Sequence, residues 1–113
     1  MTINERMQDG VAVLALVGNF VGETESSLFQ EKKFALLEAG RNRIVLDMSG
    51  LTMINSAGLG SLIAALVSTR DRGGDLRLAA LTKSVAYIIE KVHLDTTLKV
   101  FESVDGAVGS FGQ

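Results

Sequence analysis

The sequence contains no cysteine and no proline, and it has only one histidine. Without cysteine the chain can form no disulfide, no thiolate nucleophile and no cysteine-based metal site, which is consistent with a reducing compartment. Metal sites normally need several converging ligands, and one histidine does not supply them, so we expect no metal ion and no other cofactor. Because proline is absent, glycine, asparagine, aspartate and serine must mark the ends of helices and strands.

Long apolar segments and a large excess of one charge are also absent. Residues 1–10 carry no apolar stretch like that of a signal peptide, and no run approaches the roughly 18 apolar residues of a membrane span. Lysine and arginine total 11 against 13 aspartates and glutamates, with the signs interspersed, which does not favour binding to nucleic acid or anionic membranes. We therefore expect a cytoplasmic protein with no nucleic-acid partner and no membrane insertion.

The 113 residues are 47% hydrophobic and 21% charged, a balance typical of a globular chain with one core. We therefore predict a single domain over residues 1–113. Hydrophobic periodicity separates strands, where apolar residues alternate or run together, from helices, where they recur every three or four residues. The predicted strands cover 2–8, 11–18, 43–49, 76–80 and 98–101. The predicted helices cover 23–39, 85–92 and 104–111, and a further one begins at Asn55 or Ser56 and ends at Gly73-Gly74.

The order of these elements predicts how the sheet is built. Asp9-Gly10 between the first two strands is typical of a hairpin turn, and every later strand is separated from the next by a helix. This order predicts an α/β fold with a mixed, mostly parallel sheet of about five strands and about four helices. Asp47 and Ser49 close the third predicted strand, so we expect both at the carboxyl edge of the sheet.

The segment 53-MINSAGLGSLIAAL-66 opens the second predicted helix. Its larger apolar residues recur at helical spacing and predict a buried stripe, and either Asn55 or Ser56 can cap the helix start. Capping alone does not explain Gly58 and Gly60, because each glycine costs roughly 1 kcal/mol relative to alanine inside a helix. The apolar stripe is formed by Leu59, Leu62, Ile63, Leu66 and Val67.

A helical projection places small residues opposite that stripe. Ala57, Ser61, Ala64 and Ser68 form a line with Gly60 at its edge, a surface that another protein backbone could approach closely. The positive helix N-terminus would also suit an added phosphate. Two interpretations stay open: a plain capped helix packed in the core, and a regulated docking face. If the helix has a regulated docking face, arginine at position 61 or 64 should leave the stability of the domain nearly unchanged.

Enzyme motifs find little support. The stretch 58-GLG-60 lacks the third glycine of a dinucleotide-binding loop, and no G-K-[ST] follows any glycine. A triad of Ser56, His93 and Asp47 can be written down, but the G-x-S-x-G elbow is missing and spacing does not show that the three meet. We therefore expect no catalytic activity.

The stretch 44-IVLDMSGLTMINSAGLG-60 resembles the STAS domain, and specifically the anti-sigma factor antagonists of bacteria. The family pattern is a strand of the type I-V-L-D-L-S followed by G-[LV]-x-x-I-D-S-[SA]-G-L-G. The segments 73-GGDLRLAALTKSV-85 and 94-LDTTLKVFES-103 extend the resemblance over nearly the whole chain. The resemblance implies the STAS fold, and it implies a binding module rather than an enzyme.

In such proteins the serine of the motif, here Ser56, is phosphorylated by a partner that is both a serine kinase and an anti-sigma factor. The unphosphorylated protein binds this partner and frees the sigma factor, phosphorylation releases the partner, and a phosphatase would reset the switch. Because Asp47 and Ser49 are expected at the carboxyl edge of the sheet, we also expect them beside this switch. The partner-binding residues that it implies are Asn55, Ala57, Gly58, Leu59, Gly60, Ser61 and Ala64.

One residue departs from the family pattern. Asn55 stands where the family has aspartate, which keeps the capping oxygen but removes a negative charge beside Ser56. The change could slow phosphorylation, if the kinase reads the carboxylate, or ease it, because less charge opposes the phosphate. The rival hypothesis is a STAS adaptor subunit of a stress-sensing complex or a lipid-transport ATPase, without a phosphorylation cycle.

Overall fold

The computed structural model describes residues 1–112, which form one five-stranded sheet and four α-helices. The strands lie in the order β1-β2-β3-β4-β5, with β1 antiparallel to β2 and all other neighbours parallel. The predicted α/β fold with a mixed, mostly parallel sheet is confirmed. The strands are β1 (Thr2–Gln8), β2 (Val11–Phe20), β3 (Arg43–Ile54), β4 (Asp75–Ala79) and β5 (Val100–Phe101); the helices are α1 (Glu23–Glu38), α2 (Ser56–Asp71), α3 (Lys83–Lys91) and α4 (Val104–Gly109), with a 3₁₀ turn at Leu94–Thr96.

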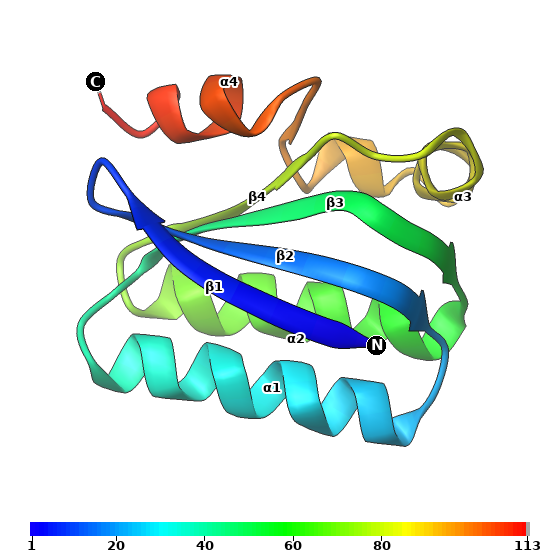
Figure 1. The fold of residues 1–113 in the computed structure, drawn as a ribbon, viewed down its shortest axis with the longest axis horizontal. Coiled ribbons are helices and arrows are strands. Elements are labelled where there is room, and N and C mark those ends of the chain that lie inside the picture. The colour runs from blue at the N-terminus through cyan, green and yellow to red at the C-terminus, as the bar shows by residue number, and fades with distance from the viewer. Residues whose placement is uncertain (113) are drawn as a thin grey trace.

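Helices cover both faces of the sheet. α1 and α2 lie side by side along one face, α4 crosses part of the other, and α3 packs beside the carboxyl end of β3 (Figure 1). The main core fills the space between the sheet and α1 and α2, where Leu46, Phe29 and Leu66 are almost fully buried. A second, smaller cluster lies beneath α4 and contains Val11, Val13, Val45, Ala79, Ala107 and Val108.

The predicted hairpin joins β1 and β2. Asp9 and Gly10 have φ angles of 52° and 79°, the left-handed pair that a tight hairpin turn of this type requires. Gln8 and Val11 face each other directly across the turn. The turn sets the register of the antiparallel pair, and β2 then runs into the centre of the sheet.

β3 is longer than the sequence pattern predicts. It continues from Arg43 to Ile54, although the stretch after Asp47 contains serine, glycine and threonine, which read as a strand end. Pairing with β2 resumes at Gly50 opposite Val17, after a bulge in which β3 has one residue more than β2. The bulge lets β3 bend and continue towards α2, so pairing with β2 overrides the local sequence signal.

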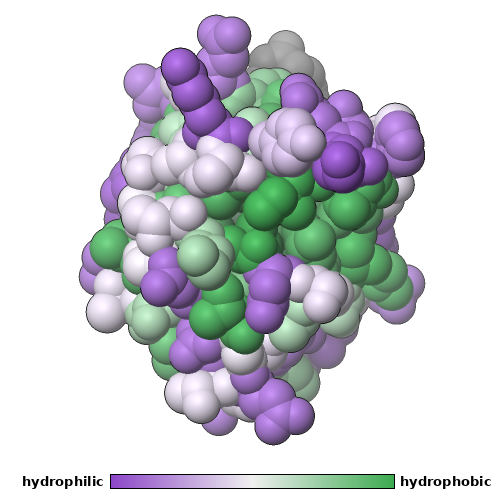
Figure 2. Space-filling view, turned by 90° about the vertical axis from the view of Figure 1, so that its right-hand side faces the viewer, coloured by the Kyte–Doolittle hydropathy of each residue, from purple (hydrophilic) through white to green (hydrophobic). Residues whose placement is uncertain are grey.

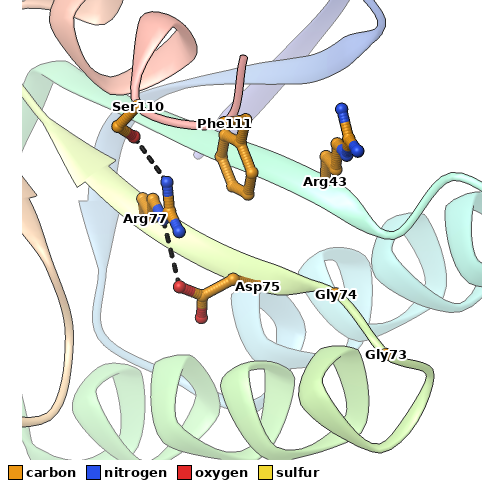
Figure 3. A pocket seen from close by; sticks show the side chains of 7 residues that line it. All are labelled: Arg43, Gly73, Gly74, Asp75, Arg77, Ser110 and Phe111. Carbon is orange, nitrogen blue, oxygen red and sulfur yellow. Dashed lines mark hydrogen bonds and ion pairs between the residues drawn. The ribbon is translucent and has the colours of Figure 1, made fainter. Parts of the chain in front are cut away.

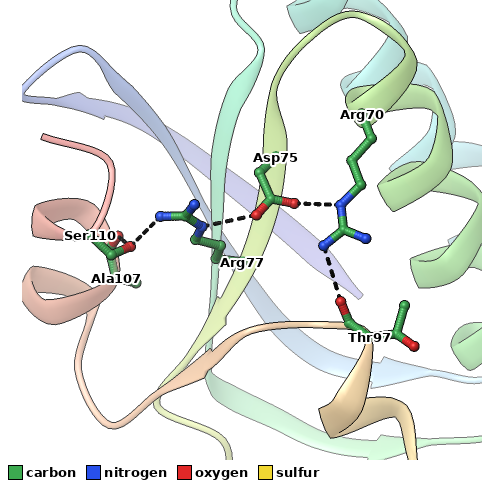
Figure 4. A network of polar contacts seen from close by, with 6 residues as sticks. All are labelled: Arg70, Asp75, Arg77, Thr97, Ala107 and Ser110. Atoms are coloured by element: carbon green, nitrogen blue, oxygen red, sulfur yellow. Dashed lines mark hydrogen bonds and ion pairs between the residues drawn. The ribbon is translucent and has the colours of Figure 1, made fainter. Parts of the chain in front are cut away.

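A polar network anchors the C-terminal end of α2 (Figure 4). Asp75 on β4 accepts from Arg70 of α2 at 2.9 Å and from Arg77 at 3.0 Å. Arg77 also donates to Ser110 at 2.6 Å, and Arg70 donates to the Thr97 carbonyl at 3.1 Å. Burial raises the pKa of Asp75, but the hydrogen bonds from Arg77 and Arg70 outweigh it, so the pKa lies below its ordinary value.

Candidate functional site

The carboxyl ends of β2 and β3 and the starts of α1 and α2 meet at one end of the molecule, on the right in Figure 1. Asn55 lies between β3 and α2 with an extended backbone and is the N-cap. Its Oδ1 accepts from the backbone N–H of Gly58 at 3.1 Å, and its Nδ2 donates to the Val21 carbonyl at 2.8 Å. The side chain therefore caps α2 and also holds the loop that leads into α1.

Ser56 is the first residue of α2, so Asn55 and not Ser56 provides the cap. The Ser56 side chain is exposed, and its hydroxyl has no hydrogen-bond partner among residues 1–112. An exposed hydroxyl at a helix N-terminus can accept a phosphate without disturbing the core, because the backbone N–H groups and the helix dipole favour negative charge there.

The two glycines after Ser56, Gly58 and Gly60, have different surroundings. A Cβ at Gly58 would lie 2.4 Å from the Phe20 carbonyl oxygen and 2.7 Å from Cγ1 of Ile54, so only glycine allows this close approach to β2. A Cβ at Gly60 would meet nothing within 4 Å. The structure therefore assigns Gly58 to internal packing, which corrects its expected place on a partner-binding surface, and leaves Gly60 on the outside.

The exposed side of α2 differs from the predicted small-residue stripe. Ala57, Gly60 and Ala64 are exposed, but Ser61 is only 6% exposed and faces α1. Both the hydroxyl and the carbonyl of Ser61 accept from Nε2 of Gln30, each at 2.9 Å. The expectation that Ser61 is exposed is wrong, because α2 packs against α1 as well as against the sheet and so buries a wider arc than its apolar stripe.

The apolar stripe of α2 is buried only in part. Leu62 and Leu66 are in the core as predicted, Leu59 and Ile63 are half-buried, and Val67 is 54% exposed. Near the start of α2, the Met53 side chain on β3 is also exposed. Figure 2 shows hydrophobic side chains gathered on the face of the molecule that carries this end of the sheet. Ser56 therefore lies on an end of the molecule with exposed small and apolar side chains.

Asp47 and Ser49 lie away from this end. Asp47 pairs with Ala15 on one side and Ala79 on the other, in the interior of β3 and not at its edge. Ile54 is the seventh residue after Asp47, which is roughly 20 Å along an extended strand. Oδ1 of Asp47 accepts from the backbone N–H and the hydroxyl of Ser49. The expectation that these two residues lie beside Ser56 is wrong, because β3 continues past them.

Residues 1–112 hold no group of three histidine or acidic side chains that could bind a metal ion. His93 follows α3 as a single left-handed residue, with φ of 61°. Across the stretch that the structure describes, every helix is too short or too polar to cross a bilayer.

A hollow of about 300 Å³ lies at the opposite end of the sheet, lined by β3, β4 and the residues after α4 (Figure 3). Arg77 forms one wall, and its guanidinium lies 3.9 Å from the centre of the Phe111 ring. Its hydrogen bonds go to Asp75 and Ser110. Arg77 therefore ties α4 to the sheet, and we assign this hollow a structural role.

Comparisons with known proteins identify the family and the fold. The STAS domain family matches residues 2–107 of the chain. A candidate anti-sigma factor antagonist from Thermotoga maritima has a TM-score of 0.90 at 23% identity, over 98% of this chain and 95% of that one. An anti-sigma factor antagonist from Mycobacterium paratuberculosis has a TM-score of 0.86 at 23% identity, over 99% and 94%. The STAS fold that the sequence motif implied is confirmed.

The same fold occurs in proteins of different kinds. The Bacillus cell fate determinant SpoIIAA in its phosphorylated form has a TM-score of 0.74 at 13% identity, over 97% of this chain and 99% of that one. A sulfate transporter family protein from Wolinella succinogenes has a TM-score of 0.75 at 20% identity, over 93% and 87%. Likeness at these identities shows the fold, and function must be argued from the site. Since the family match spans nearly all of the sequence, the chain belongs to the STAS domain family.

Proposed function

We propose that this protein is an anti-sigma factor antagonist that binds an anti-sigma factor with serine kinase activity and is released by phosphorylation of Ser56. The observation that carries the proposal is the exposed, unpartnered hydroxyl of Ser56 at the N-terminus of α2, next to an exposed surface of small residues. We define the outer face of α2 as Ala57, Gly60 and Ala64. Anti-sigma factor antagonists among the structural relatives support this assignment.

The physical basis of the switch is charge and packing. A phosphoserine adds about −1.5 to −2 charges and three acceptor oxygens. The N-terminus of α2 can hold this charge without a change of fold, because no side chain of the core has to move. A partner packed closely against the outer face of α2 would have to desolvate the phosphate, so binding weakens. The domain acts in this scheme as a substrate and a binding module, and has no catalytic activity of its own.

Intact-mass measurement tests the modification. The protein is incubated with ATP and the anti-sigma kinase of its own organism, and wild type is compared with Ser56→Ala. Ser84→Ala is the matched control, because Ser84 is another exposed serine in the first turn of a helix. We expect one added phosphate in wild type and in Ser84→Ala, and none in Ser56→Ala. Phosphate that persists in Ser56→Ala would contradict the proposed site.

Calorimetric titration with the same partner tests the docking surface. Ala64→Arg adds a long charged side chain to the outer face of α2, and we expect partner binding to weaken at least about tenfold because close approach is blocked. Ala35→Arg is the matched control, since Ala35 is exposed on α1 away from Ser56. Equal affinities for the two variants would remove the outer face of α2 from the interface.

A second candidate function is a STAS adaptor subunit without a phosphorylation cycle, in a stress-sensing complex or with a transport protein. Asn55 in place of the family aspartate favours it, and so does the occurrence of this fold in a sulfate transporter family protein. Copurification separates the two candidates: an antagonist brings down an ATP-binding kinase, and an adaptor brings down assembly or transporter subunits. Asn55→Asp adds a second test, because phosphorylation that appears only in this variant would assign the loss of the switch to Asn55.

A further inference from the structure

A groove runs between α3 and the strand β5 at the edge of the sheet. Two neighbouring hollows, of about 300 and 410 Å³, share Leu81, Ala86, Glu90 and Val100 as lining residues, so they form one continuous depression. We call it the α3–β5 groove. None of its lining residues belongs to α2 or β3, and the groove is therefore separate from Ser56 and from the outer face of α2.

The floor of the groove is apolar. Ile89 is buried beneath it, Leu81 is half-buried, and Val100 is 41% exposed although it is a large aliphatic side chain in a strand. An incoming apolar side chain placed over Leu81 and Val100 would bury surface that water now contacts, which favours binding.

Every charged residue that lines the groove is acidic. Glu90, Asp95 and Glu102 contribute three carboxylates, and none of these side chains has a hydrogen-bond or ion-pair partner within residues 1–112. The nearby Lys91 lies over the Tyr87 ring at 5.4 Å from its centre and is not part of the lining. Three uncompensated carboxylates beside an apolar floor give the groove a negative potential, so its charge complement is a basic ligand.

Lys99 does not neutralise this potential from within. It precedes Val100, and successive side chains of an extended segment point to opposite faces of a sheet. Lys99 is not among the residues that line either hollow. The positive charge of Lys99 therefore lies outside the lining of the groove.

The backbone of β5 has hydrogen-bonding groups that point away from the sheet. The N–H groups of Leu78 in β4 and of Ala80, directly after β4, donate to the carbonyls of Lys99 and Phe101, at 2.9 and 3.0 Å. Backbone groups of alternate residues point to opposite sides of a strand, so the N–H and C=O of Val100 point away from β4. β5 is the last strand of the sheet, and this outward pair is available to an additional strand.

We propose that the α3–β5 groove binds an extended, basic peptide segment of a partner protein, which adds to β5 as a sixth strand. Its backbone pairs with Val100, one apolar side chain lies over Leu81, and basic side chains two residues before and after it face Glu90, Asp95 and Glu102. The spacing follows from the strand period, since residues i−2, i and i+2 share a face. The proposed switch at Ser56 does not use this surface, so the two can be tested separately.

The test uses a peptide labelled with fluorescein at its N-terminus, fluorescein-Ser-Lys-Thr-Val-Thr-Lys-Ser-amide, and the full chain at low ionic strength. Fluorescence anisotropy measures its binding to wild type, to the triple variant Glu90→Gln, Asp95→Asn, Glu102→Gln, and to a control triple variant. The control, Glu23→Gln, Glu31→Gln, Asp71→Asn, removes three exposed carboxylates elsewhere and changes the net charge equally. We expect the groove variant to lose at least about tenfold in affinity and the control less than about twofold.

A second measurement on the wild-type protein locates the peptide without any variant. We expect the amide signals of Val100 and Glu102 to shift in NMR spectra on titration, and hydrogen exchange at Val100 to slow when its N–H becomes paired. A peptide in which glutamate replaces both lysines should not bind. Equal losses in the two triple variants, shifts confined to another surface, or no binding at millimolar peptide would each overturn the proposal.

Discussion

Asn55 donates a hydrogen bond from Nδ2 to the carbonyl oxygen of Val21 at 2.8 Å, across the gap between the start of α2 and the end of β2. The same side chain accepts from Gly58 through Oδ1. An aspartate could keep the second bond but could not make the first, because an ionised carboxylate has no hydrogen to donate. Asparagine at this position therefore caps α2 and also holds the segment after β2, whereas an aspartate would only cap α2.

This double role predicts the stability of Asn55 variants. We expect Asn55→Ala to lower the free energy of unfolding by about 1–2 kcal/mol, because it removes both hydrogen bonds. Asn55→Asp should lose less, since it keeps the cap and gains from the helix dipole. Urea denaturation measures both. Asn4→Ala, at an exposed asparagine of β1, is the control and should stay within about 0.5 kcal/mol of wild type. A smaller loss in Asn55→Ala than in Asn55→Asp would contradict this account.

The burial of Ser61 reverses the expectation from the helical projection. Ser61→Arg would force a charged side chain into the contact with Gln30 of α1, and we expect the free energy of unfolding to fall by at least about 2 kcal/mol. Ala64→Arg, at an exposed position about one helical turn away, should change the free energy of unfolding by less than about 0.5 kcal/mol. Thermal or urea denaturation of the pair decides whether this side of α2 faces α1.

Alanine at the two glycines Gly58 and Gly60 of α2 should change the stability in opposite directions. Gly58→Ala places a Cβ against the Phe20 carbonyl oxygen, and we expect a loss of about 1–3 kcal/mol because backbone must move. Gly60→Ala places its Cβ in open space, and we expect a gain of about 0.5–1 kcal/mol from better helix propensity. Denaturation midpoints of both variants check the signs, and a gain in Gly58→Ala would show that the contact with β2 is looser than the structure indicates.

Asp75 makes the stability depend on pH in the acid range. Its pKa in the folded state is lowered by Arg77 and Arg70, whereas the unfolded chain has the ordinary value of about 4. The stabilisation is therefore complete above pH of about 4 and is lost as the pH falls through the folded-state pKa. We expect Asp75→Asn to be less stable than wild type at neutral pH by about 1–3 kcal/mol, through the loss of charged hydrogen bonds.

The same reasoning sets the acid limit of this difference. Protonated Asp75 in wild type resembles asparagine in charge, so the gap between wild type and Asp75→Asn should narrow below pH of about 4. Urea denaturation at neutral and acid pH measures the gap in each condition. A gap that stays constant across the range would mean that ionised Asp75 contributes nothing to the stability of the network.

The sequence by itself determined the order of the strands and helices, the hairpin, the STAS family and the place of Ser56 at a helix start. These features depend on local patterns: residue periodicity, turn residues such as Asp9-Gly10, and a contiguous motif. The hydrophobic stripe of α2 also identified Leu62 and Leu66 as core residues, because burial against the sheet selects one face of the helix.

Only the tertiary structure decided which other residues reach the surface beside Ser56. The sequence contains no signal that β3 continues past Asp47, since its extension depends on pairing with β2 across a bulge in β3. Nor does a projection of α2 alone reveal that α1 covers Ser61, or that the Phe20 carbonyl occupies the space beside Gly58. Helical periodicity describes one face of one element, whereas exposure depends on every element packed against it, and those contacts join residues far apart in the chain.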